Sequence, residues 1–214
     1  MNAPEELRDQ IGRWDVAGAL ERIPGARPPG NGRPAAVLIL LSRPEDDYEI
    51  VFVEKNADLR HHAGQIAFPG GTMEPDELDP VAAALREAEE EAGIDPSSVE
   101  VLGALPKAHI RRSGFDVTSV IGWWREPRPL EPGDPFEIQA VHRITVPTLL
   151  DPGNRLTWVL PNGYRGPAFV VGDLFIWGFT AYLLDGMFDL LGWTQPWDAT
   201  LTAPIPPRFF SERL

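Results

Sequence analysis

The most constraining feature of the sequence is the segment 70–94, which reads GGTMEPDELDPVAAALREAEEEAGI. It places Glu87, Glu90 and Glu91 at relative positions i, i+3 and i+4. At about 100° per helical residue, these three carboxylates fall within one arc of roughly 100° on a helix. Like charges on one face repel each other, so a purely structural helix gains nothing from this arrangement. Magnesium and manganese reverse that cost, because these cations prefer carboxylate oxygens.

The same segment carries the signals of a well-bounded helix. Asp79 suits the N-cap, Pro80 suits the first helical position, and Gly93 suits the left-handed residue that ends a helix. One apolar stripe, expected to pack on a sheet, comprises Val81, Leu85, Ala88 and Ala92. The alternative is a solvated acidic helix. The glycine pair at a fixed distance, the caps and the trailing Gly93 favour a functional helix.

The segment resembles the signature of the Nudix hydrolases, G-x5-E-x7-R-E-U-x-E-E-x-G-U, in which U is apolar. The second half matches throughout, at Arg86, Glu87, Ala88, Glu90, Glu91, Gly93 and Ile94. In the first half, eight residues instead of seven separate Glu77 from Arg86. The acidic position of that half is therefore open to Glu77, Asp76 or Asp79.

A second block, LRHHAGQIAFPGG at 59–71, is similar to the pattern R-x3-G-x3-F-P-G-G of the coenzyme A diphosphatase branch. The matching residues are Arg60, Gly64, Phe68, Pro69, Gly70 and Gly71. The preceding part of that pattern, L-L-T-x-R-[SA], departs from VFVEKN at 51–56. Residues 176–191 resemble the branch's C-terminal helix, which opens with I-W-G-x-T-A. The resemblance covers about residues 35–191.

The resemblance implies a metal-dependent diphosphatase whose cofactor is Mg2+ or Mn2+. Two divalent ions can neutralise the diphosphate and activate water. We assign Glu87, Glu90 and Glu91 as metal ligands, and a carbonyl of Gly70 or Gly71 as a further one. Arg86 is expected to orient a neighbouring glutamate through a bidentate pair. Which glutamate acts as the base stays open.

Residues outside the helix complete the predicted site. Glu137 is a candidate base or metal ligand, or else a solvated loop residue. Glu131 and Asp134 are weaker candidates for the same role. We expect the substrate to be bound by residues near the glycine pair: Arg60, His61, His62, Gly70 and Gly71. The alternative to substrate binding is that one or both histidines only pack against or cap the loop.

Two other groups of residues have a functional and a structural interpretation. Lys107, Arg111 and Arg112 either bind the 3′-phosphate of coenzyme A or form a solvated edge. Trp123-Trp124 and Trp177 either stack on a base or pack in the core, and the core is the more common place for tryptophan.

Composition narrows the class of protein. With 19 basic and 32 acidic residues the net charge is -13, which argues against a nucleic-acid partner. The chain has no cysteine, which excludes disulfides and thiolate metal sites. Residues 1–10 lack an apolar signal region, and no apolar run approaches the ~18 residues of a membrane span. We therefore expect a cytoplasmic protein that binds a small nucleotide substrate and no membrane; its size is compatible with a homodimer.

The predicted fold class is α+β, an α/β/α sandwich with the mixed sheet between helices that a Nudix fold implies. We expect one domain over 1–214, with a core at about 35–191, a helical extension at 1–34 and an irregular Pro-rich tail at 192–214. The expected strands are 35–41, 48–54, 99–105, 115–124, 138–146, 156–160 and 168–171. A long helix is expected over 174–191.

The leading functional hypothesis is hydrolysis of the diphosphate of coenzyme A or acyl-coenzyme A, which gives (acyl-)4′-phosphopantetheine and adenosine 3′,5′-bisphosphate. The nearest alternative is the same chemistry on ADP-ribose or NADH. An alternative of another class is a catalytically silent Nudix domain that binds a nucleotide, although the intact REAEEE argues against it.

Overall fold

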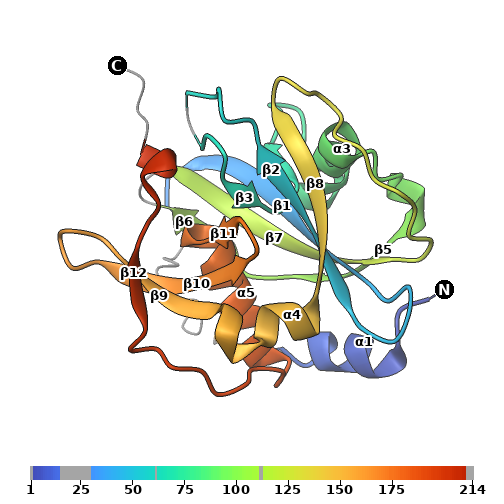
Figure 1. Cartoon of the computed structure of the whole chain (residues 1–214). Helices are drawn as coiled ribbons and strands as arrows, with labels where there is room; N and C mark the ends of the chain where they lie inside the picture. Colours follow the sequence, from blue (N-terminus) through green and yellow to red (C-terminus); the bar gives the residue numbers. More distant parts are fainter. Residues whose placement is uncertain (1, 15–29, 61, 111–112, 211–214) are drawn as a thin grey trace.

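The computed structural model describes residues 2–14, 30–60, 62–110 and 113–210, and its centre is a mixed sheet of eight strands (Figure 1). Five strands follow the order β3-β2-β1-β7-β5, while β4 pairs with β1, β6 with β7, and β8 with β2. β1 and β7 are parallel and the other pairs are antiparallel. The strands are β1 Arg33–Ser42, β2 Glu49–Lys55, β3 Ile66–Ala67, β4 Gly70–Thr72, β5 Val99–Ala104, β6 Ala108–Ile110, β7 Phe115–Trp124 and β8 Ile138–Thr145.

The central strand β1 separates two apolar clusters because successive side chains point to opposite faces of a sheet. Leu38 and Leu40 pack in the cluster that includes the alanines of helix α3, Pro80–Ala92. Ile39 and Leu41 pack in the other cluster, with helix α5, Gly178–Leu190, and a second sheet. An apolar run therefore becomes a strand that is buried on both faces.

Helix α3, Pro80–Ala92, begins and ends as predicted. The Asp79 carboxylate accepts a hydrogen bond from the Val81 N–H at 2.9 Å, and Gly93 adopts a φ of 65°. All four residues of the predicted apolar stripe belong to, or pack against, one cluster on the sheet. Val81 and Leu85 are only partly buried, whereas a row of alanines is fully buried against the sheet: Ala83, Ala84, Ala88 and Ala92. Small side chains allow α3 to approach β1 and β4 closely.

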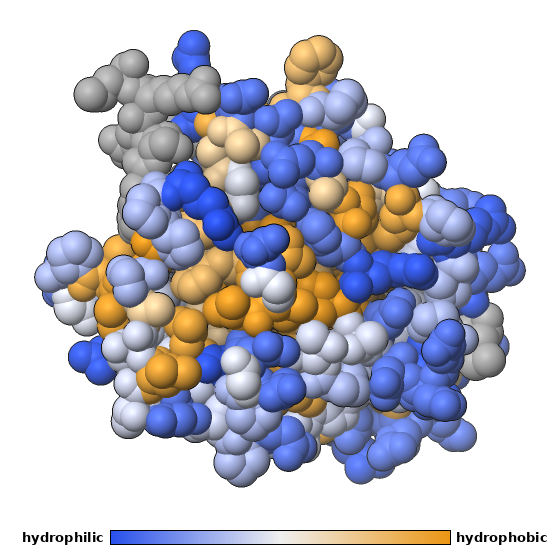
Figure 2. Space-filling model, in the orientation of Figure 1, coloured by the Kyte–Doolittle hydropathy of each residue, from blue (hydrophilic) through white to orange (hydrophobic). Residues whose placement is uncertain are grey.

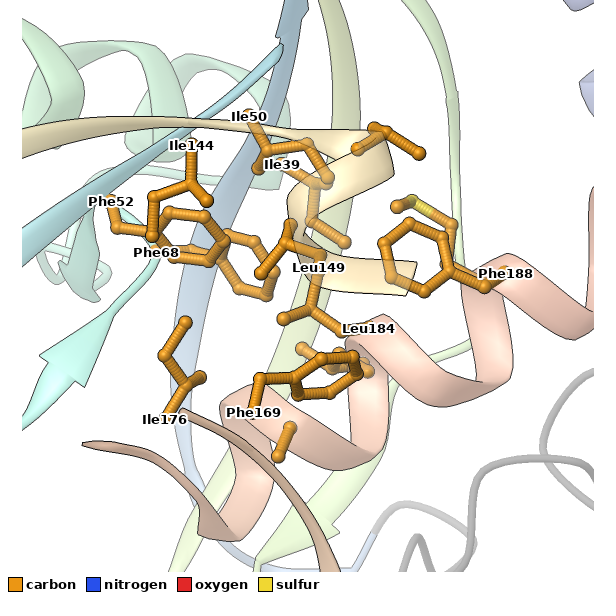
Figure 3. Packing of buried hydrophobic residues seen from close by; sticks show 14 of the residues in the cluster. Ile39, Ile50, Phe52, Phe68, Ile144, Leu149, Phe169, Ile176, Leu184 and Phe188 are labelled. Carbon is orange, nitrogen blue, oxygen red and sulfur yellow. The ribbon is translucent and has the colours of Figure 1, made fainter. Parts of the chain in front are cut away.

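The opposite face of the main sheet is covered by two helices and a second, four-stranded sheet in the order β11-β10-β9-β12. In Figure 3, Ile39 and Phe52 of the main sheet face Leu149, Leu184 and Phe169 of this second layer. The elements are α4 Val146–Leu150, α5 Gly178–Leu190, β9 Arg155–Val159, β10 Arg165–Val171, β11 Leu174–Ile176 and β12 Thr202–Pro204. The predicted fold class, a mixed sheet between helices, is confirmed.

Two predictions about the C-terminal part were wrong. The expected helix 174–191 is a short strand, β11, followed by α5, because Trp177 is extended and Gly178 has a φ of 62°. The tail is not wholly irregular, since β12 pairs in parallel with β9 and a 3-10 helix forms at Pro207–Phe210. Shorter 3-10 turns occupy Pro96–Ser98 and Pro152–Asn154.

Within the helical extension expected at 1–34, helix α1, Glu5–Gly12, buries Leu7 and Ile11. Residues 15–29 of that extension lie outside the described residues. No helix among the described residues is long and apolar enough to cross a membrane.

Candidate active site

The glycine pair in β4 brings the backbone against two glutamates of α3. The Gly70 N–H donates to Glu91 Oε2 at 3.0 Å. A Cβ at Gly71 would lie 2.6 Å from the carboxylate of Glu87. A Cβ at Gly70, whose φ is 154°, would lie 2.4 Å from the Ala36 carbonyl oxygen. Gly70 is therefore required for β4 to lie against β1, whereas a side chain at Gly71 would displace the Glu87 carboxylate.

Arg86 organises the carboxylates of Glu77, in the loop before the helix, and of Glu87 and Glu90 in the helix. It donates to both oxygens of Glu77, at 2.9 and 3.1 Å, and also to Glu87 and Glu90, each at 3.0 Å. The hydrogen bonds from Arg86 and the Glu74 N–H lower the pKa of Glu77. The acidic position left open by the sequence is therefore occupied by Glu77, while Asp79 serves as the cap.

Lys55, which was not predicted as a site residue, links the helix to the loop that carries Glu137. Its ammonium group pairs with Glu91 and donates to Glu137 Oε1 at 2.8 Å. Burial opposes the charge of Lys55, but the two carboxylates outweigh it and raise the lysine pKa. Lys55 stands where the pattern L-L-T-x-R has arginine. The signal that could have identified Lys55 is its basic side chain at the arginine position, within a segment that otherwise differs from the pattern.

Burial also raises the pKa of the two glutamates that face the glycines, Glu87 and Glu91. Glu91 is only 4% exposed, and desolvation raises its pKa even though Lys55 acts against the shift. Desolvation likewise raises the pKa of the half-buried Glu87, with Arg86 opposing it. Uncompensated negative charge is therefore costly at this surface.

The loop before β8 is fixed on both sides of the site. The Gly133 N–H donates to the Glu91 carbonyl at 3.0 Å. The Asn56 backbone N–H donates to the Glu137 carbonyl at 2.8 Å. The Asn56 side-chain amide donates to the Pro135 carbonyl, also at 2.8 Å. These bonds bring the Glu137 side chain, 53% exposed, to Lys55. The weaker candidates have other surroundings: Asp134 accepts from the Phe136 N–H, and Glu131 is exposed.

The carboxylate oxygens of the glutamates suit a divalent cation, but these side chains are not arranged around a single ion position. Within the described ranges, no three Asp, Glu or His side chains stand close enough together to hold one ion. Lys55 and Arg86 instead take up the carboxylate oxygens. Five glutamates share these two cations: Glu77, Glu87, Glu90, Glu91 and Glu137. This excess of negative charge fits added divalent cations, and the Lys55 ammonium lies between Glu91 and Glu137.

The remaining predicted residues lie in loops or outside the described residues. Arg60 is exposed in the loop after β2. His62 adopts a φ of 59° and its Nδ1 lies 3.0 Å from Gln65 Oε1, which ties it to its own loop. His61, Arg111 and Arg112 lie outside the described residues, and Lys107 is exposed.

The tryptophans support the packing interpretation. Trp123 and Trp124 are 1% and 3% exposed and belong to the core clusters. Trp177 packs against the core, with its ring centroid 5.9 Å from that of Trp158 and 6.0 Å from that of Phe209. Trp123 and Trp124 are therefore too buried to stack on a base.

Comparison with known proteins agrees with the geometry. Residues 32–159 match the NUDIX domain family. The chain is 37% identical over 164 residues to a protein named uncharacterized Nudix hydrolase NudL from Shigella flexneri serotype 5b, covering 74% of this chain and 82% of that protein. It is 37% identical over 160 residues to the NudL protein of Escherichia coli K12, covering 72% and 80%.

A solved structure shows the same fold. The MutT/nudix family protein from Enterococcus faecalis superposes with a TM-score of 0.50 at 17% identity, covering 88% of this chain and 74% of that one. The fold and the acidic helix define a Nudix diphosphatase, an enzyme of a class that generally uses divalent metals such as Mg2+ or Mn2+. The chain belongs to the Nudix family.

Proposed function

We propose that this Nudix hydrolase cleaves the diphosphate of coenzyme A or acyl-coenzyme A. The products would be (acyl-)4′-phosphopantetheine and adenosine 3′,5′-bisphosphate. One observation carries the proposal: the glycine pair that the two sequence blocks share lies against the glutamates of α3. Gly70 and Gly71 end the block that resembles the coenzyme A branch, and they contact Glu91 and Glu87 of the Nudix helix.

Glu87, Glu90 and Glu91 would hold the metal, with the Gly71 carbonyl as a further ligand. When bound, Mg2+ or Mn2+ supplies neutralisation of the diphosphate charge and activation of water. The Gly70 N–H fixes the orientation of Glu91. Arg86 is a positioning residue, because its guanidinium group contacts Glu77, Glu87 and Glu90.

Substrate phosphates need positive partners in a chain with a net charge of -13. Lys55 lies among the glutamates and is a candidate partner. Arg60, with His61 and His62, would donate hydrogen bonds to phosphate oxygens from the loop after β2. Glu137 is held by Lys55 beside Glu91, which is a suitable place for a base or a further ligand.

The second candidate function is the same reaction on ADP-ribose or NADH. The departure of residues 51–56 from the coenzyme A pattern favours it. Against it stands Lys55, which keeps a basic side chain at the arginine position of that pattern and contacts the acidic cluster.

A product assay separates these functions. The purified protein is incubated with coenzyme A, ADP-ribose or NADH, each with Mg2+ or Mn2+, and the products are resolved by chromatography. We expect metal-dependent release of adenosine 3′,5′-bisphosphate, faster than turnover of the other two. Preferential turnover of ADP-ribose or NADH would replace the proposed substrate and keep the diphosphatase. If none of the three is cleaved, the proposal is wrong.

A further inference from the structure

A cavity lies on the face of β2 opposite to the glutamate cluster. Glu54 and Lys55 are consecutive in this strand, so their side chains leave opposite faces. Lys55 reaches Glu91, whereas Glu54 lines a cavity of about 310 Å³. Figure 2 shows this side of the molecule, with a contiguous apolar area at its centre, where β3 and β11 lie in Figure 1, surrounded by hydrophilic residues. The volume is at the lower end of the ~300–1,000 Å³ range typical of ligand pockets.

The walls of this cavity come from two parts of the chain. Glu54, Ile66 and Gln139 belong to the segment that matches the NUDIX domain, residues 32–159. The facing wall, which includes Phe175 and Phe209, comes from β11 and the C-terminal 3-10 helix beyond that match. The part of the chain outside the matched segment therefore completes a cavity beside the candidate active site.

The chemistry of the lining favours an uncharged, partly apolar ligand. Phe175 and Phe209 are 7% and 8% exposed and their ring centroids lie 6.2 Å apart, so they form an apolar wall and offer no open stacking face. Glu54 and Asp173 place two carboxylates at the rim against one guanidinium group, that of Arg208. This charge balance disfavours a phosphate.

The polar groups of the rim are already oriented by hydrogen bonds. The Gln139 side-chain amide donates to Glu54 Oε1 at 3.1 Å, and His142 Nε2 lies 2.9 Å from Glu54 Oε2. Arg208 donates to the Asp173 carbonyl at 2.8 Å. A ligand with amide groups can add to this network, because an amide both donates and accepts hydrogen bonds.

The cavity and the glutamate cluster share the loop after β2. At its start, the Asn56 N–H donates to the Glu137 carbonyl. At its end, Ala63 and Gly64 line the cavity, and the Gly64 N–H donates to the Lys55 carbonyl at 3.1 Å. A substrate lying across this loop would have its diphosphate near Lys55 and its organic arm in the cavity.

We propose that this cavity binds the uncharged pantetheine arm of the substrate, with any acyl group it carries. The arm is aliphatic with two amides and no phosphate, which matches the apolar wall and the acidic rim. The inference rests on the proposed function, and it adds the place and the residues that recognise this end of the substrate.

The test fills the cavity without touching the glutamate cluster. Ala63→Phe places a ring in the cavity, and Ala57→Phe does so from a second lining position in case the first variant does not fold. Ala199→Phe makes the same change at an exposed position as the matched control. Circular dichroism melting verifies the fold of each variant. The substrates are coenzyme A and a truncated analogue, the methyl ester of 3′-phosphoadenosine 5′-diphosphate, and binding of free pantetheine is measured by calorimetry.

We expect the cavity-filling variants to raise KM for coenzyme A roughly tenfold relative to Ala199→Phe. Their KM for the truncated analogue should be unchanged, and they should lose pantetheine binding. If KM for coenzyme A is unchanged while the wild type cleaves it, the inference fails and the proposed function stands. An equal rise for both substrates would assign the cavity to the adenosine end, which also overturns the inference. If the wild type does not cleave coenzyme A, the proposed function itself fails.

Discussion

Two buried ion pairs, one on each side of the main sheet, show how surroundings decide what a charge pair does. Lys55–Glu91 joins β2 to α3, and Arg155–Asp185 joins β9 to α5. The side chains of Lys55 and Arg155 are 13% and 1% exposed. Arg155 lies between two rings, 4.2 Å from the Phe169 centroid and 4.5 Å from the Trp197 centroid. Lys55 instead also pairs with the half-exposed Glu137.

The pKa shifts of the two cations differ in sign. Two carboxylates outweigh burial at Lys55 and raise its pKa, whereas burial outweighs Asp185 at Arg155 and lowers the pKa of the arginine. Two carboxylates pair with Lys55, one of them half-exposed, whereas one carboxylate, that of Asp185, pairs with Arg155. We infer that the first pair can exchange its cation for a metal, while the second is a closed structural pair.

The largest expected effect is on stability, at Arg155. Arg155→Ala leaves Asp185 without its cation in a largely covered position, and breaking a buried pair in this way costs about 3–5 kcal/mol. We expect denaturant unfolding to show a loss of that order. The double variant Arg155→Met, Asp185→Leu removes both charges and should recover most of the stability. A single variant as stable as the wild type would contradict a closed structural pair.

The next effect is on turnover, at Glu91. Glu91→Gln removes the proposed metal ligand's charge, and we expect turnover with Mg2+ to fall by about a hundredfold or more. Glu89→Gln makes the same change at an exposed position of α3 and should keep wild-type turnover. The metal assignment is wrong if both variants retain wild-type rates.

Lys55→Met tests whether the Lys55 site exchanges cations. Without the ammonium, Glu91 and Glu137 lose the partner that the structure shows, so bound Mn2+ contributes more to stability. We expect the rise in Tm caused by saturating Mn2+ to be larger in Lys55→Met than in the wild type, by an amount equivalent to about 1–3 kcal/mol. Lys107→Met, at an exposed position, is the control. An unchanged metal-induced shift would show that lysine and metal do not compete.

The smallest effect concerns the helix that presents the glutamates. Asp79→Ala removes the N-cap bond to Val81 and should cost about 1 kcal/mol of stability. Asp76→Ala, in the same loop, should cost less than half of that. Equal losses in chemical denaturation would show that the Asp79 bond does not stabilise α3.

Local signals made α3 predictable. Its cap, its first-turn proline and its final glycine are read within a few residues, and all three occur as expected. The burial of Ala83 and Ala84 beside the predicted stripe was not foreseen, because the close approach of β1 and β4, which favours alanine, is a property of the packed sheet. The long helix over 174–191 was overpredicted because its apolar run hides the break at Gly178.

Lys55 was missed for a different reason. Its partners lie 36 and 82 residues away in the sequence, so only the pairing of β2 with β8 and the packing of α3 bring them together. The cavity beside β3 depends in the same way on the C-terminal segment folding back to Phe175. Long-range contacts of this kind leave no periodic signal in one sequence.

The most direct test of the account is anomalous diffraction from a crystal of the protein soaked in Mn2+. We predict a peak at about 2.1 Å from a carboxylate oxygen of Glu91, with the Lys55 ammonium displaced from that oxygen. A peak away from α3, or no peak in a crystal that retains the Lys55–Glu91 pair, would contradict the exchange of lysine for metal.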